Sequence, residues 1–526
     1  MPLSVSEIQE RKANALAGAG KFYGMYKRCY ELCAPNHNQY TSSAGQNKSP
    51  NVSDSIGAVL TDSYVRTLVN SLTPANMDFF VLKAGVGMSK RIAQIQGLTD
   101  VTDDQLNEIE ENLNQKLQKV SSDIFSFIHS SNFAAQITSF YYDCAIGTGM
   151  MLVQPGNTRL GLGSPLNFRS VSPRDVGLEE GCYGEISGVF RQLKIKGRNA
   201  RFEWPDWEGE APDAESQEDV DILEVTVINY ETYMWEYYVL WNDNIKLVRY
   251  YKTSPWVIYR HEVIPGEIWG RGPVIKALPD LMQVNVMENM QMMNAQLTTY
   301  GAYMVLSDDV MNPNSLKIFP GAMIPVKRNG GPSGPSIAPL PNVGNFQAHY
   351  YSRDVLKDKL QRFMMDEHIP ERPNMTATEA LERVRQTQRM LGASVGRIQY
   401  ELLQPMAQRV IDILGSQGLI TLPEEFSKID NFTLKLQVVS PIAKIQSLSD
   451  IESFVQVLQI LGSISPELIP AQVKLNECAR WLANETGAPL DLFKTQEEIA
   501  AEQAQLQQQQ QVAQMMAIQQ QQQQTA

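Results

Sequence analysis

The chain has 526 residues, 43% of them hydrophobic and 20% charged, which is enough to bury several domain-sized cores and excludes disorder of the whole chain. With 45 basic against 58 acidic residues, its net charge of −13 argues against a protein that grips DNA or RNA by neutralising phosphates. Since no apolar run is long enough to span a membrane, the N-terminus lacks a secretion-signal pattern and the five cysteines are scattered, we expect a soluble protein made in a reducing cytosol.

The N-terminal part, residues 1 to about 145, is expected to be helical. One helix ends at the Thr73-Pro74 break, a second covers about 102–130, and a third covers about 133–146. Thr102-Asp103-Asp104 opens the second helix and places acids at the positive end of its dipole. The apolar residues of this helix recur every three or four positions: Leu106, Ile109, Leu113, Leu117, Val120, Ile124 and Ile128.

A region rich in β-branched and aromatic residues follows, and it predicts strands. After a short strand at 150–154, turn residues such as Asn242-Asp243-Asn244 separate longer ones, as an antiparallel meander requires. The stretch Glu203–Asp221 holds nine carboxylates and no base, and we interpret it as a solvated loop. The strands of the predicted meander are 222–228, 233–241, 245–251 and 256–260.

Two long helices are predicted to flank a lobe rich in proline and glycine. The first, about 274–300, follows Gly270-Arg271-Gly272-Pro273 and carries five methionines between positions 282 and 293. Residues 302–344 hold too many prolines and glycines for regular helix, so extended chain and turns are expected there. The second helix, about 345–365, is dense in charges of both signs. The simplest geometry is a helical pair with the lobe at its tip.

A polar break at 368–374 precedes the longest predicted helix. Thr376-Ala377-Thr378-Glu379 fits a capping box and opens a helix over 377–416, in which Gly392, Gly396 and Pro405 predict bends. A strand at 431–439 and short helical pieces over 447–495 are expected next. The last 26 residues contain 14 glutamines, and such a tract is either disordered or helical when it packs against copies of itself.

Motifs for catalysis, cofactors or metals are weak throughout. Gly20-Lys21 lacks the serine or threonine of a phosphate-binding loop, because Phe22 follows it. Cys29, Cys33 and His37 have a spacing that could hold zinc, but Pro35 interrupts the helix and a fourth ligand is missing nearby, so structural thiols are the better interpretation. The methionine cluster could bind copper, but helix packing is the better interpretation. We therefore predict no catalytic residue, no cofactor and no metal site.

The order of these elements resembles that of the portal, or head-to-tail connector, proteins of short-tailed double-stranded-DNA bacteriophages. Local similarity lies in the leucine-rich helix that ends at Thr73-Pro74, in Gly270-Arg271-Gly272-Pro273 followed by Leu281 and Glu288-Asn289, and in Thr376-Ala377-Thr378-Glu379. The resemblance implies a mainly helical α+β subunit of a ring. Its expected parts are a wing (1–270), two stem helices (274–301 and 345–366), a clip (302–344), a tunnel loop (367–375), a long bent wing helix and strand (376–440), a crown (441–500) and a tail (501–526).

The resemblance also implies a function and a set of residues. A homo-dodecameric ring at one capsid vertex would conduct double-stranded DNA and dock the terminase large subunit and then tail or adaptor proteins, in contact with capsid and scaffolding proteins and with no membrane. It would assemble in the bacterial host cytoplasm and end in the virion. A net acidic chain suits such a channel, because a repulsive wall lets the polyanion slide. The residues expected to line the DNA channel are Arg372, Glu371, Asn374, Lys357 and Arg362. The residues expected at oligomer contacts are Arg353, Asp354, Asp358 and Lys359.

Two other classes of protein remain open at this point. One is a hydrolase built from acids such as Asp103, Asp104, Asp308 and Asp309, although a helix start and a turn explain these pairs better. The other is a non-catalytic scaffold or adaptor with a glutamine-rich interaction tail. A ring with a central hole in electron micrographs separates the portal from both.

Overall fold

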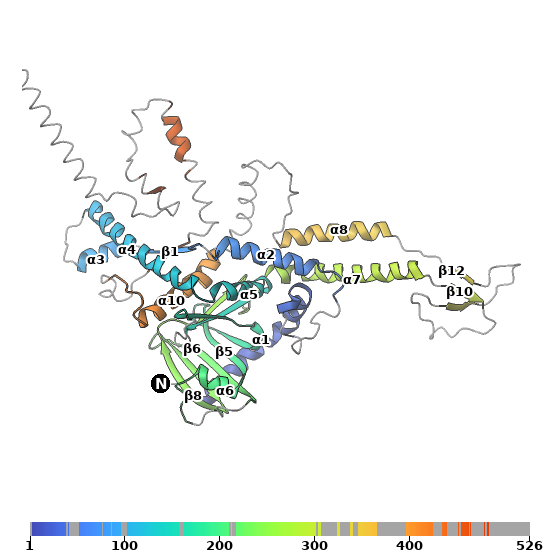
Figure 1. The fold of residues 1–526 in the computed structure, drawn as a ribbon, viewed down its shortest axis with the longest axis horizontal. Coiled ribbons are helices and arrows are strands. Elements are labelled where there is room, and N and C mark those ends of the chain that lie inside the picture. The colour runs from blue at the N-terminus through green and yellow to red at the C-terminus, as the bar shows by residue number, and fades with distance from the viewer. Residues whose placement is uncertain are drawn as a thin grey trace, which may run out of the picture. The chain divides into compact units, whose positions relative to one another are not determined.

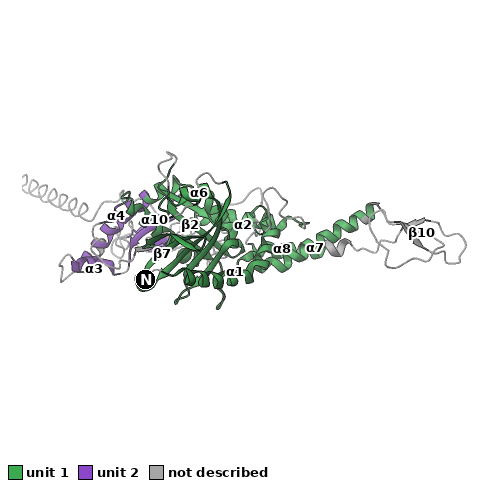
Figure 2. Cartoon of the chain, turned by 90° about the horizontal axis from the view of Figure 1, so that it is seen from below, with its two compact units in different colours: residues 1–76, 124–420 green, residues 77–123, 421–526 purple. Residues whose placement is uncertain are grey.

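The computed structural model describes most of the chain up to residue 300 and shorter parts beyond it. The described residues are 3–37, 40, 52–75, 77–85, 87–95, 102–156, 163–209, 212, 217–300, 303–306, 323–326, 337–339, 346–364, 396–423, 434–438, 451, 454–461, 463, 478, 481 and 482. They form two compact units, one of residues 1–76 and 124–420 and one of residues 77–123 and 421–526 (Figure 2). The predicted α+β class with mainly helical content is confirmed.

Helices dominate the N-terminal part of the chain, as predicted, but strand β1 (Phe80–Ala84) interrupts the region that was expected to be helical throughout. In the first unit these helices are α1 (Val5–Cys33), α2 (Ile56–Leu72) and α5 (Phe133–Ile146). Ser4 caps α1, because its side-chain oxygen accepts a hydrogen bond from the backbone N–H of Glu7. α2 ends at the expected proline break.

A five-stranded antiparallel sheet forms the main β part of the first unit. Its strands are β4 (Val176–Glu180), β5 (Ile186–Lys196), β6 (Asp219–Asn229), β7 (Met234–Trp241) and β8 (Asn244–Tyr251), paired in that order. Asn242 and Asp243, at the turn between β7 and β8, have φ values of 48° and 54°, the left-handed region that asparagine and aspartate tolerate. The predicted meander is therefore confirmed for its first three strands.

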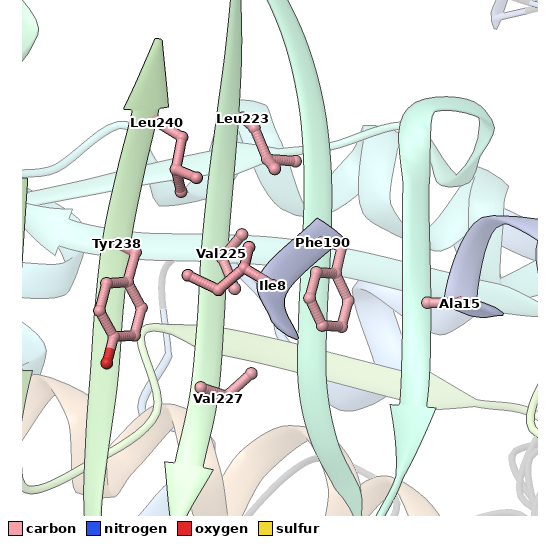
Figure 3. Packing of buried hydrophobic residues seen from close by; sticks show 8 residues of the cluster. All are labelled: Ile8, Ala15, Phe190, Leu223, Val225, Val227, Tyr238 and Leu240. Carbon is pink, nitrogen blue, oxygen red and sulfur yellow. The ribbon is translucent and has the colours of Figure 1, made fainter. Parts of the chain in front are cut away.

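Helix α1 covers one face of this sheet. Ile8 of α1 packs among side chains of β5, β6 and β7, and the cluster also contains Ala15 (Figure 3). The strand members of the cluster are Phe190, Leu223, Val225, Val227, Tyr238 and Leu240. Burial of this apolar surface fixes the N-terminal helix to the sheet.

The predicted fourth strand of the meander, Trp256–Arg260, belongs to a different sheet, and this corrects the sequence-based prediction. As β9 it pairs with β2 (Thr148–Pro155), which also pairs with β3 (Leu166–Ser170). All five residues of β9 are buried, whereas β8 is the half-exposed edge of the meander. β9 is an edge strand of the smaller sheet, and residues 398–403 pack against it.

The start of the acidic stretch is also not a solvated loop. After the short helix α6 (Gly197–Glu203), Trp204 is buried and its indole N–H donates to the hydroxyl of Tyr237. Asp206 pairs with Arg249 of β8 at 2.7 Å. The two tryptophans hold this segment against the sheet despite its carboxylates. Burying a large aromatic side chain lowers the free energy by more than several charged contacts at the surface do.

The predicted helical pair is confirmed. The helices are α7 (Pro273–Tyr300) and α8 (Phe346–Phe363), which lie side by side (Figure 1). Between them in the sequence, β10 (Tyr303–Leu306) pairs in parallel with β11 (Met323–Val326) and antiparallel with β12 (Ile337–Pro339). Extended chain thus occurs where the prolines predicted it.

The described end of the longest predicted helix is interrupted just before Pro405. A π-helical turn, Ile398–Leu403, precedes α10 (Gln404–Ser416), and the backbone N–H of Gln404 bonds to the carbonyl of Gln399. A proline has no N–H for the carbonyl four residues earlier, so the wider turn re-pairs the backbone at this point. The helix is therefore irregular beside Pro405, and the bend expected there stays a prediction. Gly392 lies outside the described residues, and the surroundings of Gly396 are open.

The second unit contains α3 (Met88–Ile95), most of α4 (Asp103–His129) and a two-stranded sheet. Strand β1 (Phe80–Ala84) pairs antiparallel with β13 (Leu434–Val438), which confirms the predicted strand at 431–439. Two side chains of α4 satisfy the other edge of β1: Ser121 accepts from the N–H of Leu82, and Asn114 accepts from that of Ala84.

Several predicted segments lie wholly or mostly outside the described residues. These are the tunnel loop 367–375, the helix over 377–395, most of 302–344, most of 441–500 and the tail 501–526. Among the helices that the structure describes, none combines the length and the apolar content of a membrane span.

Candidate functional site

The start of α7 is fixed to the core through glycines. The N–H of Gly272 donates to the carbonyl of Ile146, the N–H of Gly270 donates to the hydroxyl of Thr148, and the hydroxyl of Tyr26 donates to the carbonyl of Gly270. A Cβ at Gly272 would lie 2.1 Å from the carbonyl oxygen of Ala145, so only glycine fits. The Gly-Arg-Gly-Pro motif is therefore a rigid attachment of the long helix, a role that sequence reasoning missed.

Ion pairs connect α8 to α7. Lys359 of α8 lies 2.8 Å from Asp280 of α7, and Arg353 of α8 lies 3.5 Å from Glu288 of α7. The acids of these pairs come from α7 and the bases from α8. Leu281 and Val284, between the two acids of α7, and Leu360, next to Lys359 of α8, are buried.

A third base of α8 reaches the segment that precedes α2. Lys357 pairs at 2.9 Å with Asp54, just before α2. On the α7 side of the same junction, the side-chain oxygen of Asn285 accepts from the backbone N–H of Ser53 at 2.6 Å. The segment before α2 is thus held by both members of the helical pair.

Among the charged residues that were predicted to function, several are used inside one chain. Arg353, Lys357 and Lys359 make the contacts just described, and Arg353 also contacts Asp354 at 3.2 Å. Asp354, Asp358 and Arg362 are exposed. Their assignment to oligomer contacts or to a channel stays a prediction. The predicted channel residues Glu371, Arg372 and Asn374 lie outside the described residues.

One face of α7 is apolar and uncovered in the single chain. Met282, Val286, Met290 and Met293 recur at spacings of four, four and three, which places them on one side of the helix. They are 39% to 57% exposed. Val284 and Glu288, at the buried and ion-paired positions, lie on the other side. The methionines are therefore not core filling within one chain, and we name these four residues the α7 stripe.

The remaining candidates from the sequence are structural in the described part of the chain. Gly20-Lys21 lies inside α1, where no loop could surround a phosphate. Cys29 and Cys33 are buried, and burial raises the pKa of the Cys33 thiol to about 12, while His37 stacks on Tyr142. Asp103 and Asp104 begin α4, and Asp308 and Asp309 lie outside the described residues. Groups of three or more histidine, cysteine or acidic residues able to hold a metal are absent from the described residues.

The described part of the chain thus combines a helical pair, which carries an uncovered apolar stripe, with a body of helices and antiparallel sheets. The family model described as bacteriophage head to tail connecting protein matches residues 6–493, so the chain belongs to that family. Membership indicates a structural, connecting role.

The solved structures that match include chains from gene transfer agent particles. They include a chain of the virion of a native particle (9% identity, 64% of this chain and 79% of that chain covered, TM-score 0.32). A chain from the neck of an empty particle, computed with C6 symmetry, has 10% identity, 74% and 88% coverage and a TM-score of 0.31. A chain from the neck of a native particle, computed with C12 symmetry, has 10% identity, 63% and 76% coverage and a TM-score of 0.28. No curated protein matches.

Proposed function

We propose that copies of this chain form a portal ring, dodecameric in the virion, at one vertex of a phage capsid. The observation that carries the proposal is the α7 stripe in a member of the head-to-tail connecting family. Four large apolar side chains in one row are costly to leave in water, and a neighbouring copy of the chain can cover them. A ring in which each copy covers the next leaves no stripe exposed.

In this ring, α7 and α8 form the stem and the β10–β12 lobe belongs to the clip. The ring conducts double-stranded DNA during packaging and ejection, and the clip docks the terminase first and tail proteins later. The net charge of −13 supports conduction without tight binding, because an acidic wall repels the polyanion. Lys357 and Arg362, with Glu371, Arg372 and Asn374 of the tunnel loop, are the residues that we assign to the channel.

Electron microscopy of the purified full-length chain tests the proposal. We expect negatively stained rings with a central hole, and a ring mass in size-exclusion chromatography with light scattering. Met290→Glu places a charge in the centre of the α7 stripe and should leave the subunit folded but unassembled.

Phe202→Glu is the matched control. Phe202 is 79% exposed on α6, outside the α7–α8 pair, so this variant should still form rings. A monomeric wild-type protein would contradict the ring. Rings formed equally well by Met290→Glu would contradict the role of the stripe.

A further inference from the structure

Helix α8 carries a short exposed apolar row of its own, in addition to the α7 stripe. Tyr351 and Val355 are about one helical turn apart, and they are 77% and 51% exposed. Asp358 follows about one turn further along the same side of the helix and is also exposed. The row is therefore apolar at one end and charged at the other. We name these three residues the α8 row.

The α8 row lies on the side of its helix that faces away from α7. The opposite side is marked by Leu360, which is buried, and by Arg353, which contacts Glu288 of α7. Tyr351 and Val355 each lie two residues from Arg353 along the chain, which is about half a turn around the helix. Their side chains thus point away from the partner helix.

The α7 stripe faces away from α8 in the same manner. Val284 is buried, and Met282 and Val286 each lie two residues from it, about half a turn around α7. Met290 has the same relation to Glu288, whose carboxylate points to α8. The α7 stripe and the α8 row are therefore exposed on opposite sides of the helical pair.

The ion pairs between the two helices set the register of these surfaces. They show that α7 and α8 run antiparallel, and they show which turns lie side by side. In this register Tyr351 is at the level of Met290, and Val355 is at the level of Val286. The two apolar surfaces therefore occupy the same stretch of the helical pair.

Two different surfaces at one level are what a head-to-tail ring requires. Each copy in such a ring meets the next through one surface and the previous copy through another. A rotation about the ring axis moves no atom along that axis, so for helices that run along it the two surfaces must lie at the same level. Contact between two α7 stripes would instead join only two copies.

We propose that the α8 row of a neighbouring copy covers the α7 stripe, an inference that rests on the proposed portal ring. Tyr351 packs among the methionines of the stripe, Val355 packs on Val286, and Asp358 stays at the solvent edge of the contact. Methionine side chains adapt to the shape of a neighbour, and their sulfur atoms contact aromatic rings favourably. The same contact is repeated between all neighbouring copies of the ring.

Disulfide cross-linking between copies tests the proposal in a variant that combines Met290→Cys with Tyr351→Cys. In one copy these positions lie on opposite sides of a helical pair, and their Cα atoms are further apart than the roughly 7 Å that a disulfide can span. A bond can therefore form only between copies. After mild oxidation of assembled rings, we expect a ladder of covalent oligomers up to the ring size in denaturing gels, and its loss on reduction.

Matched variants show whether the cross-link is specific. All of them carry Cys182→Ser and Cys478→Ser, which remove the native cysteines that are not buried. Met290→Cys alone should give no covalent dimer, and a dimer would show that stripe meets stripe. Met290→Cys with Phe363→Cys should give no ladder, because Phe363 lies about 18 Å further along α8 than Tyr351.

A second measurement serves if the cysteines prevent assembly. Benzoylphenylalanine in place of Tyr351 keeps a large aromatic side chain at the contact, and irradiation of the rings should join it to the peptide 282–293 of another copy, identified by mass spectrometry. Rings that give no ladder and whose label is joined elsewhere overturn this inference and leave the ring intact. A wild-type protein without rings in the microscope overturns the proposed function, and this inference with it.

Discussion

Asp143 is a buried carboxyl group in the middle of the helical core. It accepts a hydrogen bond from the hydroxyl of Tyr30 at 2.5 Å, and burial raises its pKa to about 7, although the bond from Tyr30 partly opposes the shift. The carboxyl group is therefore still protonated in the folded chain at pH values where the unfolded chain has lost the proton. Folding becomes less favourable as the pH rises through this window.

We predict that Asp143→Asn stabilises the protein relative to wild type increasingly between about pH 4 and pH 7, and by a constant amount above pH 7. The gain should reach up to about 4 kcal/mol, because each unit of pKa shift corresponds to about 1.4 kcal/mol. Melting temperatures of both proteins over this range measure it.

The measurement must compare the stability of Asp143→Asn with that of wild type at each pH, because a second buried group titrates in the same pH window. Burial lowers the pKa of His261 to about 4, so its contribution to stability rises with pH from about 4 to 6.5 and opposes that of Asp143 in wild type. A difference between variant and wild type that stays constant from pH 4 to pH 8 would contradict the raised pKa of Asp143.

Glycines in this chain differ in what surrounds them, and this predicts opposite effects of the same substitution. Gly272→Ala forces a Cβ to within 2.1 Å of a backbone carbonyl and should destabilise the protein by about 2 to 4 kcal/mol. Gly24→Ala, in the open middle of α1, should stabilise it by about 1 kcal/mol. An unchanged or higher melting temperature for Gly272→Ala would show that the attachment of α7 is not as close as described, and a lower one for Gly24→Ala would contradict the open surroundings of Gly24.

At the scale of elements, α8 depends on ion pairs more than its length suggests. Among its described side chains, only Leu360 is buried, while three basic residues reach acids of α7 or of the segment before α2. Partly exposed ion pairs are individually weak and are screened by salt. The helix is therefore held to α7 by contacts that ionic strength can loosen.

A double-mutant cycle at Lys359 and Asp280 measures one such contact. With Lys359→Met and Asp280→Asn, we expect a coupling free energy of about 0.5 to 1 kcal/mol at low salt, decreasing at high salt. Both single variants should still form rings. Loss of rings in Lys359→Met alone, without coupling to Asp280, would mean that Lys359 serves a neighbouring subunit instead.

At the scale of the whole molecule, the lobe between α7 and α8 is separable from the body. Its strands β10, β11 and β12 pair only with one another among the described strands. We predict that deletion of 303–343 leaves a soluble, folded body and prevents docking of terminase and tail proteins. Pull-down assays with those partners measure the loss. A deletion variant that still packages DNA and attaches tails would contradict the clip assignment.

The tunnel loop gives the last prediction. Arg372→Ala should leave ring assembly intact and change the amount or the retention of packaged DNA, because the loop is assigned to the part of the channel nearest the DNA. The length of packaged DNA and its release from filled heads are the measurements. Values equal to wild type for both would remove Arg372 from the channel.

The sequence by itself determined the elements that depend on local chemistry. The 3-4 spacing of apolar residues over 102–130 predicted a helix there. The proline break after Leu72 and the glycine after Ile146 predicted where two other helices end, because capping acts within a few residues. The proline-rich lobe between two helices was predictable for the same reason. Membership in the connecting family was predictable from the order of these elements.

Only the tertiary structure decided which distant segments meet. Trp256–Arg260 has the composition of a fourth meander strand but pairs with β2, more than 100 residues earlier in the chain, and is buried there partly by residues 398–403. Lys359 pairs with an acid 79 positions away, and Lys357 pairs with one more than 300 positions away. The tight fit of Gly272 and the partly unpaired guanidinium of Arg260 likewise depend on residues from several elements. Such contacts arise from the packing of whole faces, and no local pattern encodes them.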